Sequence, residues 1–310
     1  MSWCVRWKVM RIEVSDTAQA NDAFSLLNLD VRGVQLETGK VRGAIETETV
    51  GEALFMSAFF DRRTLFTGSR MPGMIPFCFM GSGDSFHHGE TSFGRELCGF
   101  KDDSPDTHVH WHGELCATYL PHNRLKAYLH QINALQALDR LDRLNQLPLS
   151  EASLQTLSRL FYRGLEGKVP SDEKVYGTIA LLLEEPVEPE PADHDPKNDP
   201  LIREFVQVAH DMDQKEPLTL LQIATGLFTT QKTLQRHCKE AYGIGPKQLV
   251  DRVRMEQARM LLVKDGLTPT AVARAFGFTR PQEFARKYRT TFGVTPSFDH
   301  QRSLPRLKGI

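Results

Sequence analysis

Four ionisable side chains alternate along one short stretch of the sequence. They are His108, His110, His112 and Glu114, within the segment HVHWHGE. If this segment is a strand, every second side chain shares a face, so we expect the four to converge. Three imidazoles and a carboxylate could hold Zn, Fe or Mn, or could give a polar lining to a pocket for a small effector. We assign His108, His110 and His112 to such an effector pocket, and we expect no bound metal and no cofactor.

Two further sets of polar side chains have the spacing of an exposed helical face near the C-terminus. Phe284, Tyr288 and Phe292 recur at intervals of four, as a buried helical face requires, and Leu234 is predicted to be buried in an earlier stretch. The side chains left exposed are Gln231, Lys232, Gln235, Arg236, Lys239, Arg280, Gln282, Glu283, Arg286 and Lys287.

These exposed side chains are suited to contact double-stranded DNA. Residues at the start of a recognition helix reach base edges, and later residues reach phosphates. Because arginine can pair with guanine and glutamine with adenine, we predict base contacts for Arg280 and Gln282. In the earlier stretch the base candidates are Gln231, Lys232 and Gln235. Phosphate contacts are predicted for Arg286 and Lys287, and for Arg236 and Lys239.

Helix start signals place both stretches on helices. Thr219 with Gln222, and Thr279 with Gln282, have the spacing of a capping box. Thr230 can cap the helix that follows it, and Thr268 precedes a proline at the first helical position. Residues 246–262 form one continuous helical pattern between the two stretches. The pairs Ile223-Ala224 and Val272-Ala273 each precede a turn, so two helix-turn-helix motifs joined by a helix are predicted.

Over residues 218–298 the sequence resembles the AraC/XylS family of bacterial transcription regulators. The matching elements are Gly243-Ile244-Gly245-Pro246, residues 254–262, Val272-Ala273 through Gly277-Phe278, residues 284–288, and Phe292-Gly293-Val294-Thr295-Pro296. The resemblance implies two recognition helices in successive major-groove segments. It also implies an N-terminal, strand-rich, cupin-like effector domain with dimerisation helices, and an activator that contacts RNA polymerase.

Two residues depart from the family pattern in the first motif. Phe228 stands where the family usually has the turn glycine, and a left-handed phenylalanine would cost about 1 kcal/mol. We therefore expect a rearranged turn in which Gly226 takes the unusual conformation. Cys238 replaces a large aromatic residue on the first recognition helix.

The charge distribution separates the C-terminal third from the rest of the chain. Residues 201–310 hold 18 Lys and Arg against 10 Asp and Glu, although the whole chain has a net charge of only −1. Such a basic region on an acidic body is typical of a domain that meets phosphates. Residues 184–200 hold five prolines and seven acidic residues, which predicts an extended linker.

The N-terminal region has two styles of sequence. Residues from about 21 to 120 are rich in glycine and short apolar stretches, which favours short antiparallel strands. From about 121 to 183 the pattern is helical, and a leucine stripe from Leu125 to Leu144 predicts one helix that ends before Pro148. The stripe is compatible with two roles: packing of the helix against the strand domain, or an interface between two copies of the chain. Ser150 is predicted to cap a second helix, and a third covers residues 172–183.

The predicted fold is therefore α+β: a strand-rich, cupin-like domain with following helices, then an all-α domain with two helix-turn-helix motifs. The predicted domains are an effector-sensing and dimerisation domain over 1–183, the linker over 184–200 and a DNA-binding domain over 201–310. We expect a homodimeric, effector-responsive regulator that binds DNA and RNA polymerase and is not an enzyme.

Two alternatives remain open. The H-x-H-x-x-x-E spacing at 108–114 is similar to half of the metal motif of cupin enzymes, so a metalloenzyme domain could be fused to a DNA-binding tail. The later Pro-x-Gly with His and Asn that completes that motif is missing. A regulator without a ligand, controlled by protein contacts, is the other alternative.

The five cysteines are scattered and odd in number, which fits a reducing compartment. The N-terminus lacks an apolar signal core, and no apolar run is long enough to span a bilayer. We therefore expect a cytoplasmic protein without a membrane partner.

Overall fold

The computed structural model describes residues 10–87, 90–101, 106–186 and 198–303. The chain divides into two compact units. The first comprises residues 1–15, 19–32 and 42–194, and the second comprises residues 16–18, 33–41 and 195–310. The predicted linker over 184–200 overlaps one helix that ends at Glu184 and another that begins at Asn198. Residues 187–197 lie outside the described residues.

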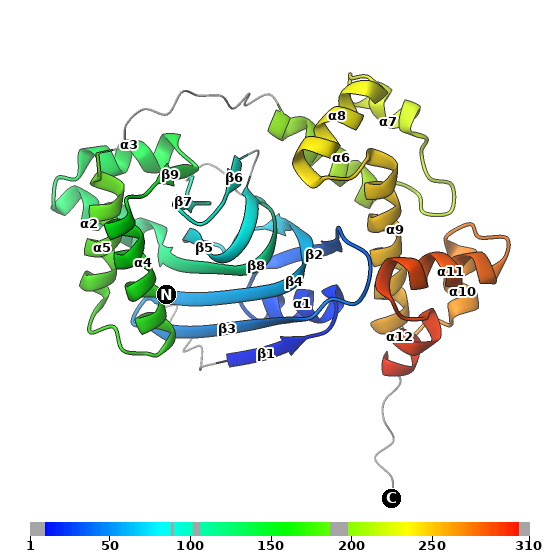
Figure 1. Ribbon diagram of the computed structural model, residues 1–310, viewed down its shortest axis with the longest axis horizontal. Helices are drawn as coiled ribbons and strands as arrows, with labels where there is room; N and C mark the ends of the chain where they lie inside the picture. The colour runs from blue at the N-terminus through cyan, green and yellow to red at the C-terminus, as the bar shows by residue number, and fades with distance from the viewer. Residues whose placement is uncertain (1–9, 88–89, 102–105, 187–197, 304–310) are drawn as a thin grey trace, which may run out of the picture. The chain divides into compact units, whose positions relative to one another are not determined.

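The first unit is built on one antiparallel sheet (Figure 1). Its strands are β1 (Met10–Val14), β2 (Asp30–Gln35), β3 (Gly43–Val50), β4 (Ala53–Ser69), β5 (Met74–His87), β6 (Glu90–Ser92), β7 (Glu96–Cys98), β8 (Asp106–Pro121) and β9 (Gln146–Pro148). The order is β1-β3-β4-β8-β5-β7-β9, with β2 also paired to β4 and β6 to β5.

Two features of this sheet differ from the prediction of short strands beginning near residue 21. Helix α1 (Thr17–Ser25) occupies that position, since Ala20, Ala23 and Phe24 give it a buried face. Strands β4 and β8 run for 17 and 16 residues. Several of the glycines that suggested frequent turns lie inside strands instead. Gly83 of β5 pairs with Gly113 of β8, and their φ angles are +80° and +88°. They bend the strands where a larger residue would be strained.

The alternation of side chains gives the sheet two different faces. Phe55, Phe79 and Cys116 belong to one core with the helices, whereas their neighbours Met56 and Leu115 line a cavity on the opposite face. The helices that cover the first face are α2 (His122–Gln131), α3 (Leu135–Arg143), α4 (Glu151–Leu165) and α5 (Asp172–Glu184), and they gather on one side of the sheet in Figure 1.

The predicted single helix with the leucine stripe is two helices. Helix α2 ends at Gln131, and Asn133 adopts a left-handed conformation with φ of +56° before α3 begins at Leu135. Asparagine tolerates this conformation, which reverses the chain after a helix. The stripe therefore serves two separate helices, and Leu125, Leu129 and Leu141 are all buried in the first unit's core. The predicted cap Ser150 and the third helix are confirmed, since Ser150 accepts a hydrogen bond from the Ser153 amide.

The second unit is helical in its described C-terminal part. It contains α6 (Asn198–Asp211), α7 (Leu220–Gly226), α8 (Gln231–Tyr242), α9 (Pro246–Val263), α10 (Pro269–Ala275), α11 (Pro281–Phe292) and α12 (Pro296–Ser303). Helix α9, predicted over 246–262, runs between the group α6 to α8 and the group α10 to α12 in Figure 1. No helix within the described ranges is long and apolar enough to cross a membrane.

Helix α4 approaches the sheet closely at Gly164. A Cβ atom on Gly164 would lie 2.4 Å from ring atoms of Phe55, which is fully buried. We predict that Gly164→Ala lowers the free energy of unfolding by about 1–3 kcal/mol, because the rings around Phe55 must shift. As a control, Gly226→Ala on α7 meets nothing within 4 Å. It should stabilise by up to about 1 kcal/mol through helix propensity. Urea unfolding of both variants measures whether the free energy of unfolding falls for Gly164→Ala and rises for Gly226→Ala.

Candidate nucleic-acid interface

Helix α8 presents a continuous row of polar side chains above a buried apolar row. Thr230 caps the helix by accepting from the Thr233 amide, and Gly243 ends it at φ of +70°. Leu234 and Cys238 are fully buried, one turn apart. All five residues predicted to face DNA are exposed: Gln231, Lys232, Gln235, Arg236 and Lys239. Burial raises the pKa of the Cys238 thiol to about 12, so this residue is a neutral part of the core.

Helix α11 has the same amphipathic arrangement. Phe284, Tyr288 and Phe292 are buried and in contact as a chain of rings, as the spacing predicts. Four of the five predicted DNA residues lie outside this buried row: Arg280, Gln282, Glu283 and Arg286. The predicted capping box at Thr279 does not form, because the helix begins one residue later, with Arg280 as its N-cap and Pro281 at the first helical position. Arg280 lies 3.9 Å from Glu283.

Lys287 differs from its prediction as a phosphate contact. Its ammonium donates to Asp251 on α9 at 2.5 Å, and about two thirds of each side chain is shielded from solvent. The helical period places Lys287 next to the buried Tyr288 row, where α9 supplies a carboxylate. The lysine therefore links two helices of the unit.

Arg289 is a basic residue of the same helix that the sequence reasoning missed. It is exposed in the last turn of α11, and together with Arg286, Thr290 and Thr295 it lines a surface groove. Arg289 follows Arg286 by three residues, which places the two on one helical face. That spacing is the signal that could have found it.

A buried arginine fixes the inner side of α11. The Arg259 guanidinium, on α9, donates to Asp299 of α12 at 3.2 Å and lies over the Phe292 ring at 3.5 Å from its centroid. The Tyr288 hydroxyl donates to the same carboxylate at 2.6 Å. Arg259 and Asp299 are both buried, so this charge pair and its hydrogen bonds tie α9, α11 and α12 together.

A family model described as a helix-turn-helix domain matches residues 223–301. The chain is 33% identical over 99 residues to the HTH-type transcriptional regulator CdhR of Pseudomonas aeruginosa. That match covers 31% of this chain and 30% of that protein. It is 32% identical over 90 residues to the probable thc operon regulatory protein of Rhodococcus erythropolis, covering 27% of this chain and 26% of that protein. This segment is therefore a helix-turn-helix domain similar to those of transcription regulators.

Among solved structures, the chain is similar to an AraC-type transcriptional regulator from Chromobacterium violaceum. The identity is 27%, the match covers 36% of this chain and 99% of that chain, and the TM-score is 0.33. The match spans only 30% and 26% of the lengths of the two curated relatives.

The two turns of this helix-turn-helix domain differ at one position. Gly277 in the second turn has φ of +73°, and a Cβ atom there would lie 2.4 Å from the Lys215 carbonyl oxygen. In the first turn Phe228 has φ of +52°, whereas Gly226 remains in helix α7. The expectation that Gly226 would absorb the turn was therefore wrong: Phe228 itself adopts the left-handed conformation, and its side chain is 99% exposed. The open surface around Phe228 leaves room for a side chain that the second turn excludes.

We predict that Phe228→Gly raises the free energy of unfolding by up to about 1 kcal/mol. The variant relieves the left-handed strain of a non-glycine residue and removes no core contact, although a more flexible unfolded chain offsets part of the gain. Gly277→Ala should destabilise, because it adds both strain and a contact with the Lys215 carbonyl. Thermal unfolding of the two variants beside the unmodified chain measures both effects. A destabilised Phe228→Gly chain would show that the exposed ring makes contacts that stabilise the turn.

Two of the three histidines of β8, His110 and His112, lie in one polar cluster. His110 stacks on Phe86 at 5.0 Å, and His112 lies 2.5 Å from a carboxylate oxygen of Asp84. Arg63 donates to Asp84 at 2.7 Å and lies 3.2 Å from His110. His110 and His112 thus belong to a polar cluster with Arg63 and Asp84, and neither lines the cavity described below.

Glu114 lies apart from this polar cluster. Its carboxylate accepts from Ser57 at 2.7 Å and from Tyr162 of α4 at 3.2 Å. In the described part of the chain, no three His, Cys, Asp or Glu residues are grouped closely enough to hold a metal ion. The hypothesis of a metal centre at 108–114 therefore has no support from the arrangement of these side chains.

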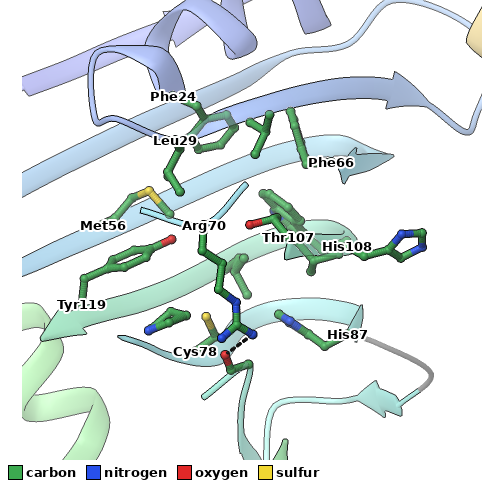
Figure 2. Close-up of a pocket in the computed structure, with 16 residues that line it drawn as sticks. Phe24, Leu29, Met56, Phe66, Arg70, Cys78, His87, Thr107, His108 and Tyr119 are labelled. Carbon is green, nitrogen blue, oxygen red and sulfur yellow. Dashed lines mark hydrogen bonds between the residues drawn. The ribbon is translucent and has the colours of Figure 1, made fainter. Parts of the chain in front are cut away.

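The opposite face of the sheet encloses a cavity of about 60 Å³ (Figure 2). Its wall includes Phe24 and Leu29 from the α1 region, Met56 and Phe66 from β4, and Trp111 from β8. His108 is the one member of the predicted histidine set among its lining residues, and its ring points away from the other labelled side chains in Figure 2. The cavity therefore has a different lining from the predicted effector pocket, which stays a prediction.

Proposed function

We propose that the chain is a sequence-specific, DNA-binding transcription regulator whose helices α8 and α11 enter successive major-groove segments. The observation that carries this proposal is the pair of exposed polar rows, each on a helix of 12 residues within the matched segment. Each row lies above a buried apolar row, so the polar side chains are presented by a rigid support.

The residues divide by their place on the helices. Arg280 and Gln282 at the start of α11 are proposed to read base edges, as are Gln231, Lys232 and Gln235 on α8. Arg286 and Arg289 are proposed to contact phosphates, with Arg236 and Lys239 in the same role on α8. Glu283, beside Arg280, orients that arginine, and Lys287 is assigned to the interior pair with Asp251.

We further propose that the regulator responds to an effector held in the first unit and acts in the cytoplasm as an activator that contacts RNA polymerase. The cavity of the first unit supports the effector. The direction of regulation and the polymerase contact rest on the family resemblance, which covers the C-terminal segment.

A homodimer is proposed through the outer face of α2, α3 and α5. Ile132, Leu135 and Leu181 are 47%, 65% and 74% exposed. Ile132 and Leu181 line a surface groove together with the oppositely charged neighbours Glu173 and Lys174. A two-fold axis brings the same patch of both copies together. The apolar side chains of one copy then cover those of the other, and each charged side chain faces a patch that holds the opposite charge.

The DNA proposal is tested by selecting bound sequences from a random pool and measuring affinity for the selected site. We expect Arg280→Ala to weaken specific binding by about 1–3 kcal/mol and to relax one base position, because a bidentate base contact is lost. Arg163→Ala, an exposed arginine on α4, serves as the matched control and should leave affinity unchanged. The dependence of affinity on salt separates the proposed role of Arg289 from that of Lys287. Arg289→Ala should reduce the slope of log affinity against log salt concentration by about 0.9, and Lys287→Ala should reduce it by much less. An absence of any enriched sequence would contradict the proposed function.

The dimer is tested by sedimentation velocity of the full chain. We predict that Leu181→Lys shifts the protein to the monomer, since the charge would be buried in the apolar interface without a partner. Leu26→Lys is the control, because Leu26 is 56% exposed and is not one of the residues that line this groove. A monomeric unmodified chain, or a dimer that tolerates Leu181→Lys, would contradict this interface.

A further inference from the structure

Phe228 combines two unfavourable features in the first turn of the helix-turn-helix domain. Its backbone is left-handed, with φ of +52°, and its side chain is 99% exposed. The other non-glycine residues with positive φ in the described part of the chain are Asn28 and Asn133, and asparagine tolerates this conformation. A single exposed apolar side chain is ordinary, but a bulky one on a strained backbone points to a function.

Neither packing nor turn geometry accounts for a phenylalanine at this position. An almost fully exposed ring buries almost no apolar area against the fold, so it adds little to stability. A glycine would fit the same turn with less strain, as Gly277 does in the second turn. The contact that favours a ring at Phe228 therefore lies outside the folded chain.

The turn places this ring beside the side chains that are proposed to read bases. Thr230 is the N-cap of α8, and Gln231 is its first residue, three positions after Phe228. Three residues span at most about 11 Å even when fully extended, so the two backbones lie within that distance of each other. Because the start of a recognition helix approaches base edges, the Phe228 ring is within reach of the same groove.

The charge of the surrounding sequence favours nucleic acid as the partner of the ring. Residues 217–239 contain no Asp or Glu, and Lys232, Arg236 and Lys239 give this stretch a formal net charge of +3 with histidine neutral. Such a segment is attracted to phosphates and holds no carboxylate that would repel them. The ring is thus carried on a part of the domain that is suited to approach DNA.

The groove identifies the group that the ring would contact. The C5 methyl group of thymine is exposed in the major groove, and phenylalanine is one of the side chains that pack against it. Apolar side chains that insert between base steps act from the minor groove. A ring at the start of a helix that enters the major groove is therefore placed for the methyl group and not for insertion.

We propose that Phe228 is a further specificity-determining residue, whose ring packs against the C5 methyl group of a thymine in the DNA segment entered by α8. This inference rests on the proposed DNA-binding function. The second motif has no equivalent, because a Cβ atom on Gly277 would lie 2.4 Å from the Lys215 carbonyl oxygen. We expect a thymine requirement from this turn position beside α8 and none beside α11.

The test measures the affinity of the full chain for the sequence selected from the random pool. The base position that relaxes in Gln235→Ala locates the segment beside α8, and each thymine there is replaced in turn by uracil, which lacks only the methyl group. One replacement should weaken binding about fourfold, the effect of leaving one methyl group in water. Phe228→Gly should bind the thymine site at least about fourfold more weakly, and the same replacement should then change its affinity by less than about 1.5-fold.

Further variants separate the ring from the turn. Phe228→Ala also lacks the ring but keeps a strained non-glycine residue, so it should lose the same affinity as Phe228→Gly. Neither variant removes a charge, so the slope of log affinity against log salt concentration should stay unchanged. A lower slope would overturn the direct contact, because it would show that α8 is displaced and loses phosphate contacts. Phe93→Ala, at a 71% exposed ring of the first unit, is the matched control and should bind as the unmodified chain does.

The outcomes separate this inference from the proposed function. Unchanged affinity in Phe228→Gly would overturn the inference, and so would an equal loss of affinity on the thymine and the uracil sites. An enriched sequence without thymine in the segment beside α8 would also overturn it, and would leave the proposed regulator intact. An absence of any enriched sequence would contradict both.

Discussion

The buried pair of Arg259 and Asp299 fixes the position of helix α11. Arg259 reaches from α9 to α12, and the Tyr288 hydroxyl of α11 joins the same carboxylate. Arg259 also pairs with the buried Glu256, so removing Arg259 would take away a buried counter-charge from two carboxylates, which is much less favourable than losing a surface ion pair. The side chain of Arg259 also covers the Phe292 ring. The inner face of α11 is thereby held in one rotation, and the exposed face with Arg280 and Arg286 follows from it.

The helical segment was largely predictable because its signals are local. Caps at Thr219, Thr230 and Thr268, and the buried spacing of Phe284 and Tyr288, are properties of neighbouring residues. The exceptions depend on distant residues. Lys287 looks exposed from its own helix, but Asp251 lies 36 positions away in the chain and pairs with it. No local pattern contains that contact.

The strand region was less predictable for a related reason. Alternation predicted one shared face for His108, His110 and His112, but His108 lines the cavity, whereas His110 and His112 belong to the cluster with Arg63 and Asp84. Arg70, Cys78 and His87, which also line the cavity, were missed because they come from separated parts of the chain and have no common spacing. The interruption of the leucine stripe at Asn133 was missed because the apolar period continues through it, although an asparagine there carries a weak signal for a left-handed turn.

The cavity has a consequence for the mechanics of the first unit. Interiors are normally packed as densely as organic crystals, so a partly open space lined by Phe66, Trp111 and Leu115 is a local deficit of dispersion contacts. Unfolding eliminates such space, which makes the unfolded chain smaller in volume than the native one. Hydrostatic pressure should therefore act on this unit at the cavity. A molecule that fills the space would make the first unit less compressible. Occupancy of the cavity could then be followed as a change in the volume difference between the native and the unfolded chain.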